Sequence, residues 1–126
     1  MKKHPIFVLD DHHDTLEMID MVLVSQGYPV MVCDDTERAL QELAKCQQPC
    51  VLLLDHSLLK PDPLDFIQKV RNINNPVHFI LMTGLNAKLK AEELGLDHYV
   101  QKPFDPIALL EMIHKLYSVC GTPSVA

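Results

Sequence analysis

Four short apolar runs in this chain each end in a polar side chain, and this pattern leaves few folds open. Three of the runs end at Asp10, Asp55 and Thr83, and the fourth ends at Lys102. Continuous apolar runs of this length are typical of strands that are buried on both faces of a parallel sheet. The carboxyl ends of such strands share one edge of the sheet, where ligands bind. The sequence therefore predicts that these four polar groups converge on one small pocket.

Segments in which apolar residues recur at helical spacing separate the apolar runs. Strand-like runs that alternate with helical patterns predict an α/β fold, with a parallel sheet and helices on both faces. The strands are expected at residues 6–10, 30–33, 50–54, 77–82 and 98–101. A short helix is expected at residues 87–94, and the last helix is expected to begin near Asp105-Pro106. The core positions expected on that last helix are Ile107, Leu110, Ile113 and Leu116.

Capping residues mark several helix boundaries. Asp35 or Thr36 suits an N-cap, and Asp62-Pro63 suits an N-cap followed by proline at the first helical position. Gly27 and Gly95 follow helical patterns and are expected to end them. A turn is expected at Asn74-Asn75-Pro76 and an unstructured tail after the last helix.

The chain has 126 residues, which is enough for one domain with one core. We expect that domain at residues 1–119, followed by a flexible tail or the start of a linker at residues 120–126. The formal net charge of -6 argues against direct nucleic-acid binding, because phosphate contacts need Lys and Arg. No apolar stretch suits a membrane span or a signal peptide, so we expect a cytoplasmic protein without a membrane partner.

The carboxylates at the predicted sheet edge suit a metal ion. Asp10 and Asp11 are adjacent where the chain turns, so both can reach one cation, and Asp55 would complete the cluster. Three close carboxylates repel one another and need a cation, and magnesium prefers carboxylate oxygens. Their charges balance those of one divalent metal and Lys102. Since a carboxylate can also act as a nucleophile and form an aspartyl phosphate, these residues predict a magnesium and phosphoryl site.

Each of these residues alone has a simpler interpretation. Adjacent aspartates at a strand end commonly cap a helix, and a lone aspartate after an apolar run is commonly a turn residue. Thr83 alone suits a structural role, and Lys102-Pro103 suits a surface lysine before a helix. The specific signal is the combination, which falls at the ends of the first, third, fourth and fifth predicted strands.

From Ile6 to Leu116 the chain resembles the response-regulator receiver domain of two-component signalling, of the chemotaxis-regulator-like kind. The segments that carry the resemblance are Val8–Asp11, Leu53–Asp55, Leu81–Gly84 and Gly95–Phe104. The resemblance implies a doubly wound, flavodoxin-like fold, in which five parallel strands have the order 2-1-3-4-5.

The resemblance also implies a role for each pocket residue. Asp55 would be the phosphoacceptor, with Thr83 and Lys102 as the other catalytic residues. Thr83 and Tyr99 would form the switch, in which the aromatic ring turns inward when the threonine moves. Mg2+ would be the cofactor, and its expected ligands are Asp10, Asp11, Asp55 and the backbone carbonyl of Ser57.

The partners implied by the resemblance are those of a phosphorelay. A histidine kinase or a histidine phosphotransfer protein would donate the phosphoryl group to Asp55. The chain would be a signalling switch that catalyses its own phosphorylation and dephosphorylation. It would control an unknown downstream target or output domain, and a second copy of the chain, in a homodimer, would be a further partner. Leu85 is apolar and cannot orient an attacking water, so we expect slow self-hydrolysis.

The chain departs from the family pattern in two places. Leu59 stands where the family usually has proline, and Pro63 where it usually has glycine, so we expect an unusual, stiff loop after Asp55. The segment from Thr83 to Gly95 is shorter than usual by about one helical turn. That segment belongs to the face through which receivers commonly dimerise or signal, so an altered output face is expected.

Three histidines near the predicted pocket allow two interpretations. His12, His13 and His56 flank the acidic pocket and suit either a transition-metal or pH-sensitive site or, as we favour, partly exposed loop positions.

A phosphohydrolase of the haloacid dehalogenase type also uses an aspartate nucleophile, magnesium, Thr and Lys, but its two motif aspartates are spaced differently and the chain is short for that fold. A degenerate receiver that acts only as an interaction module is the other alternative.

Overall fold

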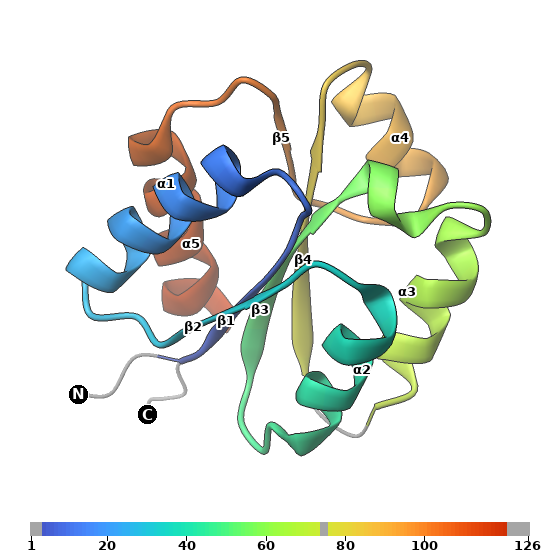
Figure 1. Ribbon diagram of the computed structural model, residues 1–126, viewed down its shortest axis with the longest axis horizontal. Helices are drawn as coiled ribbons and strands as arrows, with labels where there is room; N and C mark the ends of the chain where they lie inside the picture. Colours follow the sequence, from blue (N-terminus) through green and yellow to red (C-terminus); the bar gives the residue numbers. More distant parts are fainter. Residues whose placement is uncertain (1–3, 74–75, 121–126) are drawn as a thin grey trace.

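Five parallel strands form a single sheet, whose order is β2-β1-β3-β4-β5 (Figure 1). The structure is a computed structural model that describes residues 4–73 and 76–120, so the expected turn at Asn74-Asn75 and the tail at 121–126 lie outside the described residues. The strands are β1 (Ile6–Leu9), β2 (Val30–Cys33), β3 (Cys50–Asp55), β4 (Val77–Thr83) and β5 (Tyr99–Gln101). The predicted α/β class and the strand order are confirmed.

The predicted strand bounds differ from the observed ones by one residue at four ends. The strands β3 and β4 include Asp55 and Thr83, which were expected just after them. The strand β1 ends at Leu9, although the N–H of Asp10 still donates to the carbonyl of Cys33 at 3.1 Å, and β5 begins one residue after His98. These shifts leave all the polar strand ends at the same edge.

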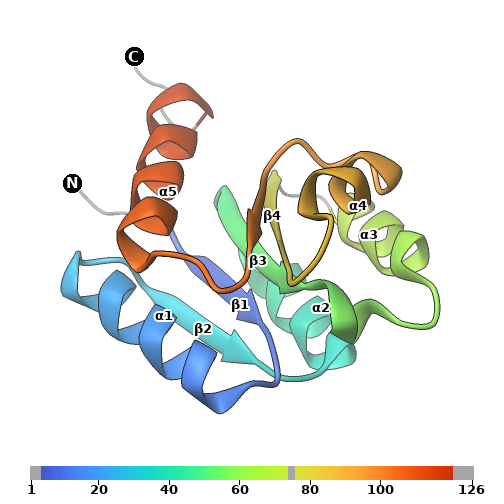
Figure 2. The same ribbon diagram turned by 90° about the horizontal axis from the view of Figure 1, so that it is seen from above.

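Helices cover both faces of the sheet. The helices α1 (His13–Ser25) and α5 (Pro106–Cys120) lie on one face, and α2 (Thr36–Lys45), α3 (Pro63–Arg71) and α4 (Ala87–Glu93) lie on the other (Figures 1 and 2). A single 3-10 turn, η1 (His56–Leu59), follows β3. Among residues 4–73 and 76–120, no helix is long and apolar enough to span a bilayer.

The predicted capping residues take the expected positions. Asp35 rather than Thr36 is the N-cap of α2, because its carboxylate accepts from the N–H of Glu37 at 3.0 Å. Asp62 caps α3 in the same way, with Pro63 as the first helical residue. After α1 the chain turns through Gly27 at φ +86°, a left-handed conformation that glycine adopts without a Cβ penalty.

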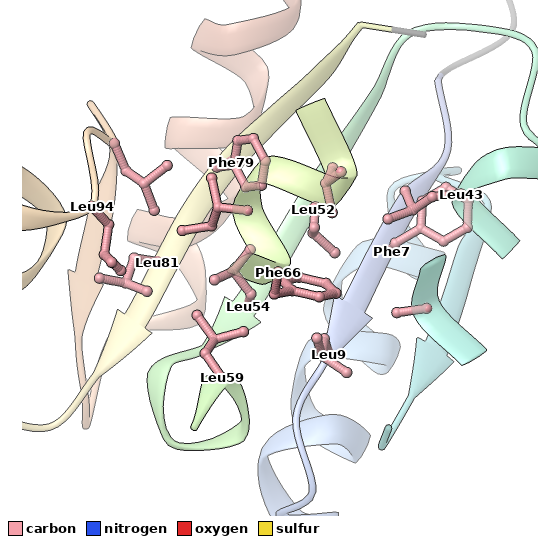
Figure 3. Close-up of a cluster of buried hydrophobic side chains, with 14 of the residues drawn as sticks. Phe7, Leu9, Leu43, Leu52, Leu54, Leu59, Phe66, Phe79, Leu81 and Leu94 are labelled. Atoms are coloured by element: carbon pink, nitrogen blue, oxygen red, sulfur yellow. The ribbon is translucent and has the colours of Figure 1, made fainter. Parts of the chain in front are cut away.

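Alternate residues of each strand pack on opposite faces, which creates two hydrophobic clusters. One cluster lies under α2, α3 and α4 and includes Phe7, Leu52, Leu54, Phe66 and Leu81 (Figure 3). The other lies under α1 and α5 and includes Ile6, Val8, Leu53, Ile80 and Met82. Burial on both faces explains why β1 and β3 read as continuous apolar runs rather than alternating ones.

The prediction that Ile107 belongs to the core is wrong, because its side chain is 56% exposed. The first turn of α5 directs that position to solvent, and Leu109 (2% exposed) packs against the sheet with Ile113 and Leu116. The spacing of Leu109, Ile113 and Leu116 is also helical, so the periodicity alone allowed either phase at the start of the helix.

The loop after β3 is anchored by Leu59, which stands where the family usually has proline. Leu59 ends the 3-10 turn and is 2% exposed within the cluster under α2, α3 and α4. The side chain of Leu59 is therefore a core contact that holds η1 against β3 and β4.

Candidate functional site

The ends of β1 and β3 place three carboxylates in one cluster. In the sheet Leu9 lies beside Leu54, so the residues that follow them, Asp10 and Asp55, are neighbours at the carboxyl edge. Asp10 is 0% exposed and Asp55 is 4% exposed, whereas the side chain of Asp11 is about half exposed. One oxygen from each carboxylate lies within 4.8 Å of the others. The predicted convergence of these three residues is confirmed.

Lys102 supplies a cation directly beside the buried carboxylates. Its Nζ atom lies 2.7 Å from Oδ2 of Asp10 and 3.7 Å from Oδ2 of Asp55. The backbone N–H of Lys102 donates to the carbonyl of Thr83 at 2.7 Å, so the pairing of β4 with β5 continues to the lysine and fixes where its side chain starts. Burial alone would raise the pKa of Asp10, but hydrogen bonds from Lys102 and His12 outweigh it and hold that pKa below its usual range.

Thr83, the last residue of β4, opens onto the same cleft. It is 4% exposed and lines a hollow of ≈ 430 Å³ together with Asp55 and Lys102. Its Oγ1 atom accepts a hydrogen bond from Nζ of Lys90 on α4 at 3.3 Å. The strand end that the sequence predicts therefore brings Thr83 to the site, and α4 adds a second ammonium that the sequence reasoning missed.

Asp55 is oriented by the turn that follows it. The N–H of Ser57 donates to Oδ1 of Asp55 at 3.3 Å, and Oγ of Ser57 donates to Oδ2 at 2.8 Å. Asp55 is thus both the last residue of β3 and the N-cap of η1. The Ser57 carbonyl remains a predicted metal ligand.

His12, one of the three histidines expected beside the acidic pocket, contacts the carboxylate cluster directly. Its Nδ1 atom lies 2.8 Å from Oδ1 of Asp10, 3.3 Å from Oδ1 of Asp11 and 3.5 Å from Oδ2 of Asp55. The hydrogen bond to Asp10, together with the charge of that carboxylate, raises the pKa of His12. The side chain is 61% exposed, which agrees with the expectation of a partly exposed loop position. The sequence signal for this contact is the position of His12 directly after Asp10 and Asp11.

The other two flanking histidines lie differently. His56 belongs to η1 and lines the cleft. Its pKa is lowered mainly by burial and, to a smaller extent, by the charge of the Lys90 ammonium. His13 begins α1 and lines a separate hollow that α1 shares with β2.

Tyr99 lies outside the cleft in this structure. It is 36% exposed on β5 and lines a hollow beside α4 with residues that include Leu89 and Gln101. Its role as a switch residue remains a prediction.

The residues present fit a divalent metal ion. Three carboxylates and one Lys102 ammonium leave two negative charges in a partly buried cluster, and a divalent cation would balance them. The oxygens of Asp10, Asp11 and Asp55 and the Nδ1 of His12 are close enough to one another to coordinate a single ion.

The comparisons identify the class of protein that this fold and site define. Residues 6–114 match the response regulator receiver domain family, so the chain belongs to that family. Receiver domains of two-component response regulators are signalling switches rather than classical enzymes, and the acidic cluster at Asp55 fits a phosphoacceptor site.

Among curated proteins, the chain is 30% identical to the alkaline phosphatase synthesis transcriptional regulatory protein PhoP of Bacillus subtilis, over 80% of this chain and 43% of that protein. It is 32% identical to the probable transcriptional regulator ycf27 of Porphyridium aerugineum, over 84% of this chain and 45% of that protein. The chain thus spans about half the length of the curated relatives it matches.

Solved structures of receiver domains have a similar fold. A signal receiver domain from Bermanella marisrubri is 30% identical, with a TM-score of 0.75, over 89% of this chain and 96% of that one. The receiver domain of the sensor histidine kinase PA1611 from Pseudomonas aeruginosa is 20% identical, with a TM-score of 0.70, over 89% of this chain and 95% of that one. In that structure a magnesium ion is coordinated in the active site cleft.

Proposed function

We propose that Asp55 accepts a phosphoryl group from a phosphohistidine on a histidine kinase or a histidine phosphotransfer protein. The observation that carries this proposal is the position of Asp55. Its buried carboxylate lines a cleft shared with Thr83 and Lys102 and belongs to a cluster with Asp10 and Asp11. A carboxylate nucleophile needs no separate base, unlike a hydroxyl or a thiol.

The proposed phosphoryl transfer from the donor histidine to Asp55 takes place in one step. An oxygen of Asp55 forms a bond to phosphorus, the bond from phosphorus to the donor imidazole nitrogen breaks, and that nitrogen keeps the electron pair and takes up a proton from water. Nζ of Lys102, 3.7 Å from Asp55, stabilises the negative charge of the transferred group. The Thr83 hydroxyl donates a hydrogen bond to one of its oxygens.

Mg2+ is the proposed cofactor, and its proposed ligands are Asp10, Asp11, Asp55 and the carbonyl of Ser57. When bound, the metal shields the attacking carboxylate and the phosphoryl oxygens from mutual repulsion. The magnesium ion in the PA1611 receiver domain and the net negative charge of the present cluster support this assignment.

The proposed output follows from two residues beside α4. Thr83 would move toward the phosphoryl group, and Tyr99, now at the surface of β5, would turn inward to fill the vacated space. The resulting change would control a downstream target, an output domain or a second copy of the chain. Leu85 is 71% exposed at the cleft and offers no group to orient water, so we propose slow self-dephosphorylation.

Intact mass spectrometry after incubation with acetyl phosphate and Mg2+ tests the proposal. The expected result is one added phosphoryl group, which EDTA abolishes and Asp55→Asn prevents. Asp97→Asn is the matched control, because it makes the same change at an exposed loop position. If the wild-type chain accepts phosphate neither from acetyl phosphate nor from a phosphorylated kinase, the chain is an interaction module and the proposal is wrong.

A further inference from the structure

Besides Lys102, two lysines line the hollow at Asp55: the exposed Lys60, which follows η1, and the half-buried Lys90 on α4. Nζ of Lys90 donates to Oγ1 of Thr83 at 3.3 Å, and Lys90 lines the same hollow as Asp55 and Lys102. His56, in the turn η1 that follows Asp55, lines the same hollow. The side chain is only partly exposed, so it does not simply extend into solvent.

Local geometry explains why Lys90 reaches the cleft. Only three residues, Gly84 to Asn86, connect β4 to α4, and Asn86 adopts a left-handed conformation at φ +51°. The N–H of Lys90 donates to the carbonyl of Asn86 at 2.9 Å, so Lys90 lies in the first turns of the helix, on the side of the strand end. The same helix places Lys88 in a different hollow, beside Tyr99.

The charge of a phosphorylated site calls for an additional cation. In the unphosphorylated site, the three carboxylates balance one Lys102 ammonium and one divalent metal. Phosphorylation replaces the single charge of Asp55 with a phosphoryl group that carries close to two negative charges. The phosphorylated site therefore has about one negative charge left over, and it is created within reach of the Thr83 hydroxyl that Lys90 already contacts.

We propose that Lys90 is a second phosphoryl-binding cation, which contacts the group on Asp55 opposite Lys102 and thereby ties α4 directly to the phosphorylated state. This inference rests on the proposed role of Asp55. Thr83 and Lys102 hold the phosphoryl group from the strand ends, whereas Lys90 is part of a helix. A contact from Lys90 therefore attracts α4 toward the site when the phosphoryl charge is present.

Binding of beryllofluoride, a phosphoryl mimic that attaches to the acceptor carboxylate, tests this role. The affinity is measured by calorimetry in Mg2+ for the wild type, Lys90→Met, Lys90→Gln and Lys90→Arg. Loss of a charge-assisted hydrogen bond should weaken binding about tenfold in the Met and Gln variants, and Arg should restore most of it. Lys88→Met is the matched control on the same helix and should bind like the wild type.

A second readout separates phosphoryl binding from a merely structural role. Amide NMR shifts of residues 87–93 are followed on saturation with beryllofluoride. In the wild type they should change strongly, and in Lys90→Met the changes on α4 should shrink while those at Thr83 and Lys102 persist.

Each outcome decides between the two proposals. If the wild type and Lys88→Met bind the mimic and both uncharged Lys90 variants bind equally well, Lys90 is not a phosphoryl ligand and this inference alone is overturned. If the wild type itself does not bind, or if Asp55→Asn binds as well as the wild type, the role of Asp55 fails and the inference fails with it. Equal urea midpoints for the Lys88 and Lys90 variants show that any difference in affinity is not a folding defect.

Discussion

Replacing Lys102 by methionine should destabilise the metal-free protein strongly. Asp10 is 0% exposed, and Nζ of Lys102 contacts its Oδ2 atom at 2.7 Å. Removal of one partner from a buried ion pair costs about 3–5 kcal/mol, because a charge is left buried without compensation. Lys102 is itself 20% exposed and His12 Nδ1 lies 2.8 Å from the same carboxylate, so we place the loss near about 3 kcal/mol, at the lower end of that range.

The assay is urea unfolding in EDTA at neutral pH. Lys88→Met is the control, because it removes the same ammonium from an exposed position of α4 and should change stability by no more than about 0.5 kcal/mol. The double variant Asp10→Asn with Lys102→Met should recover most of the loss, since the amide needs no counter-ion. The melting temperature of Lys102→Met should fall by roughly 10 °C.

Two results would refute this reasoning. If Lys102→Met is as stable as Lys88→Met, the ammonium does not compensate Asp10. If the double variant is no more stable than the single one, the cost comes from lost packing of the lysine stem rather than from the uncompensated carboxylate.

Three further predictions concern the core, pH and the thiols. Leu59→Ala should lower the free energy of unfolding by about 2–4 kcal/mol, because Leu59 is 2% exposed, whereas Leu64→Ala at a 53% exposed position of α3 should cost far less; urea midpoints that fall equally would contradict this. Burial lowers the pKa of His78, so the unfolded chain takes up a proton that the folded chain resists; stability should be complete above about pH 6.5 and fall as the pH drops below it, and His78→Phe should flatten that slope in urea midpoints measured across the window, with equal slopes counting against it. Burial raises the pKa of Cys50 to about 12, so iodoacetamide should label the more accessible Cys46 first in the native protein, which peptide mass spectrometry after short exposure will show or disprove.

The positions of Asp10, Asp55, Thr83 and Lys102 could be predicted because they depend on one property of parallel sheets. A residue that ends a buried strand must lie at the carboxyl edge, and all carboxyl ends of a parallel sheet share that edge. The prediction needed neither side-chain rotamers nor exact strand bounds, so it tolerated errors of one residue at four strand ends.

The contacts of His12 and Lys90 could not be predicted in this way. His12 reaches the carboxylates from a turn, and its direction depends on the backbone between β1 and α1 rather than on any periodic pattern. Lys90 reaches Thr83 across a helix whose position depends on the left-handed conformation of Asn86 and on how α4 packs. The error at Ile107 has a similar cause, since a helical repeat does not fix which face its first turn buries.

The packing of α4 is light enough for a single charge to influence its position. The buried residues of the helix itself are two alanines, Ala87 and Ala91, while its C-terminal end is held by the larger Leu94. Burial contributes about 0.8 kcal/mol for each methyl-sized group, so the two alanines together contribute roughly 1.6 kcal/mol. A hydrogen bond to a charged group contributes about 1.5–3 kcal/mol, which is comparable. A contact between Lys90 and a phosphoryl group on Asp55 could therefore shift the N-terminal half of α4 against its packing, with Leu94 as the fixed end. On this reasoning the segment from Thr83 to Gly95, which the family resemblance indicates is short by about one helical turn, would make the link between phosphorylation and the expected output face shorter rather than weaker.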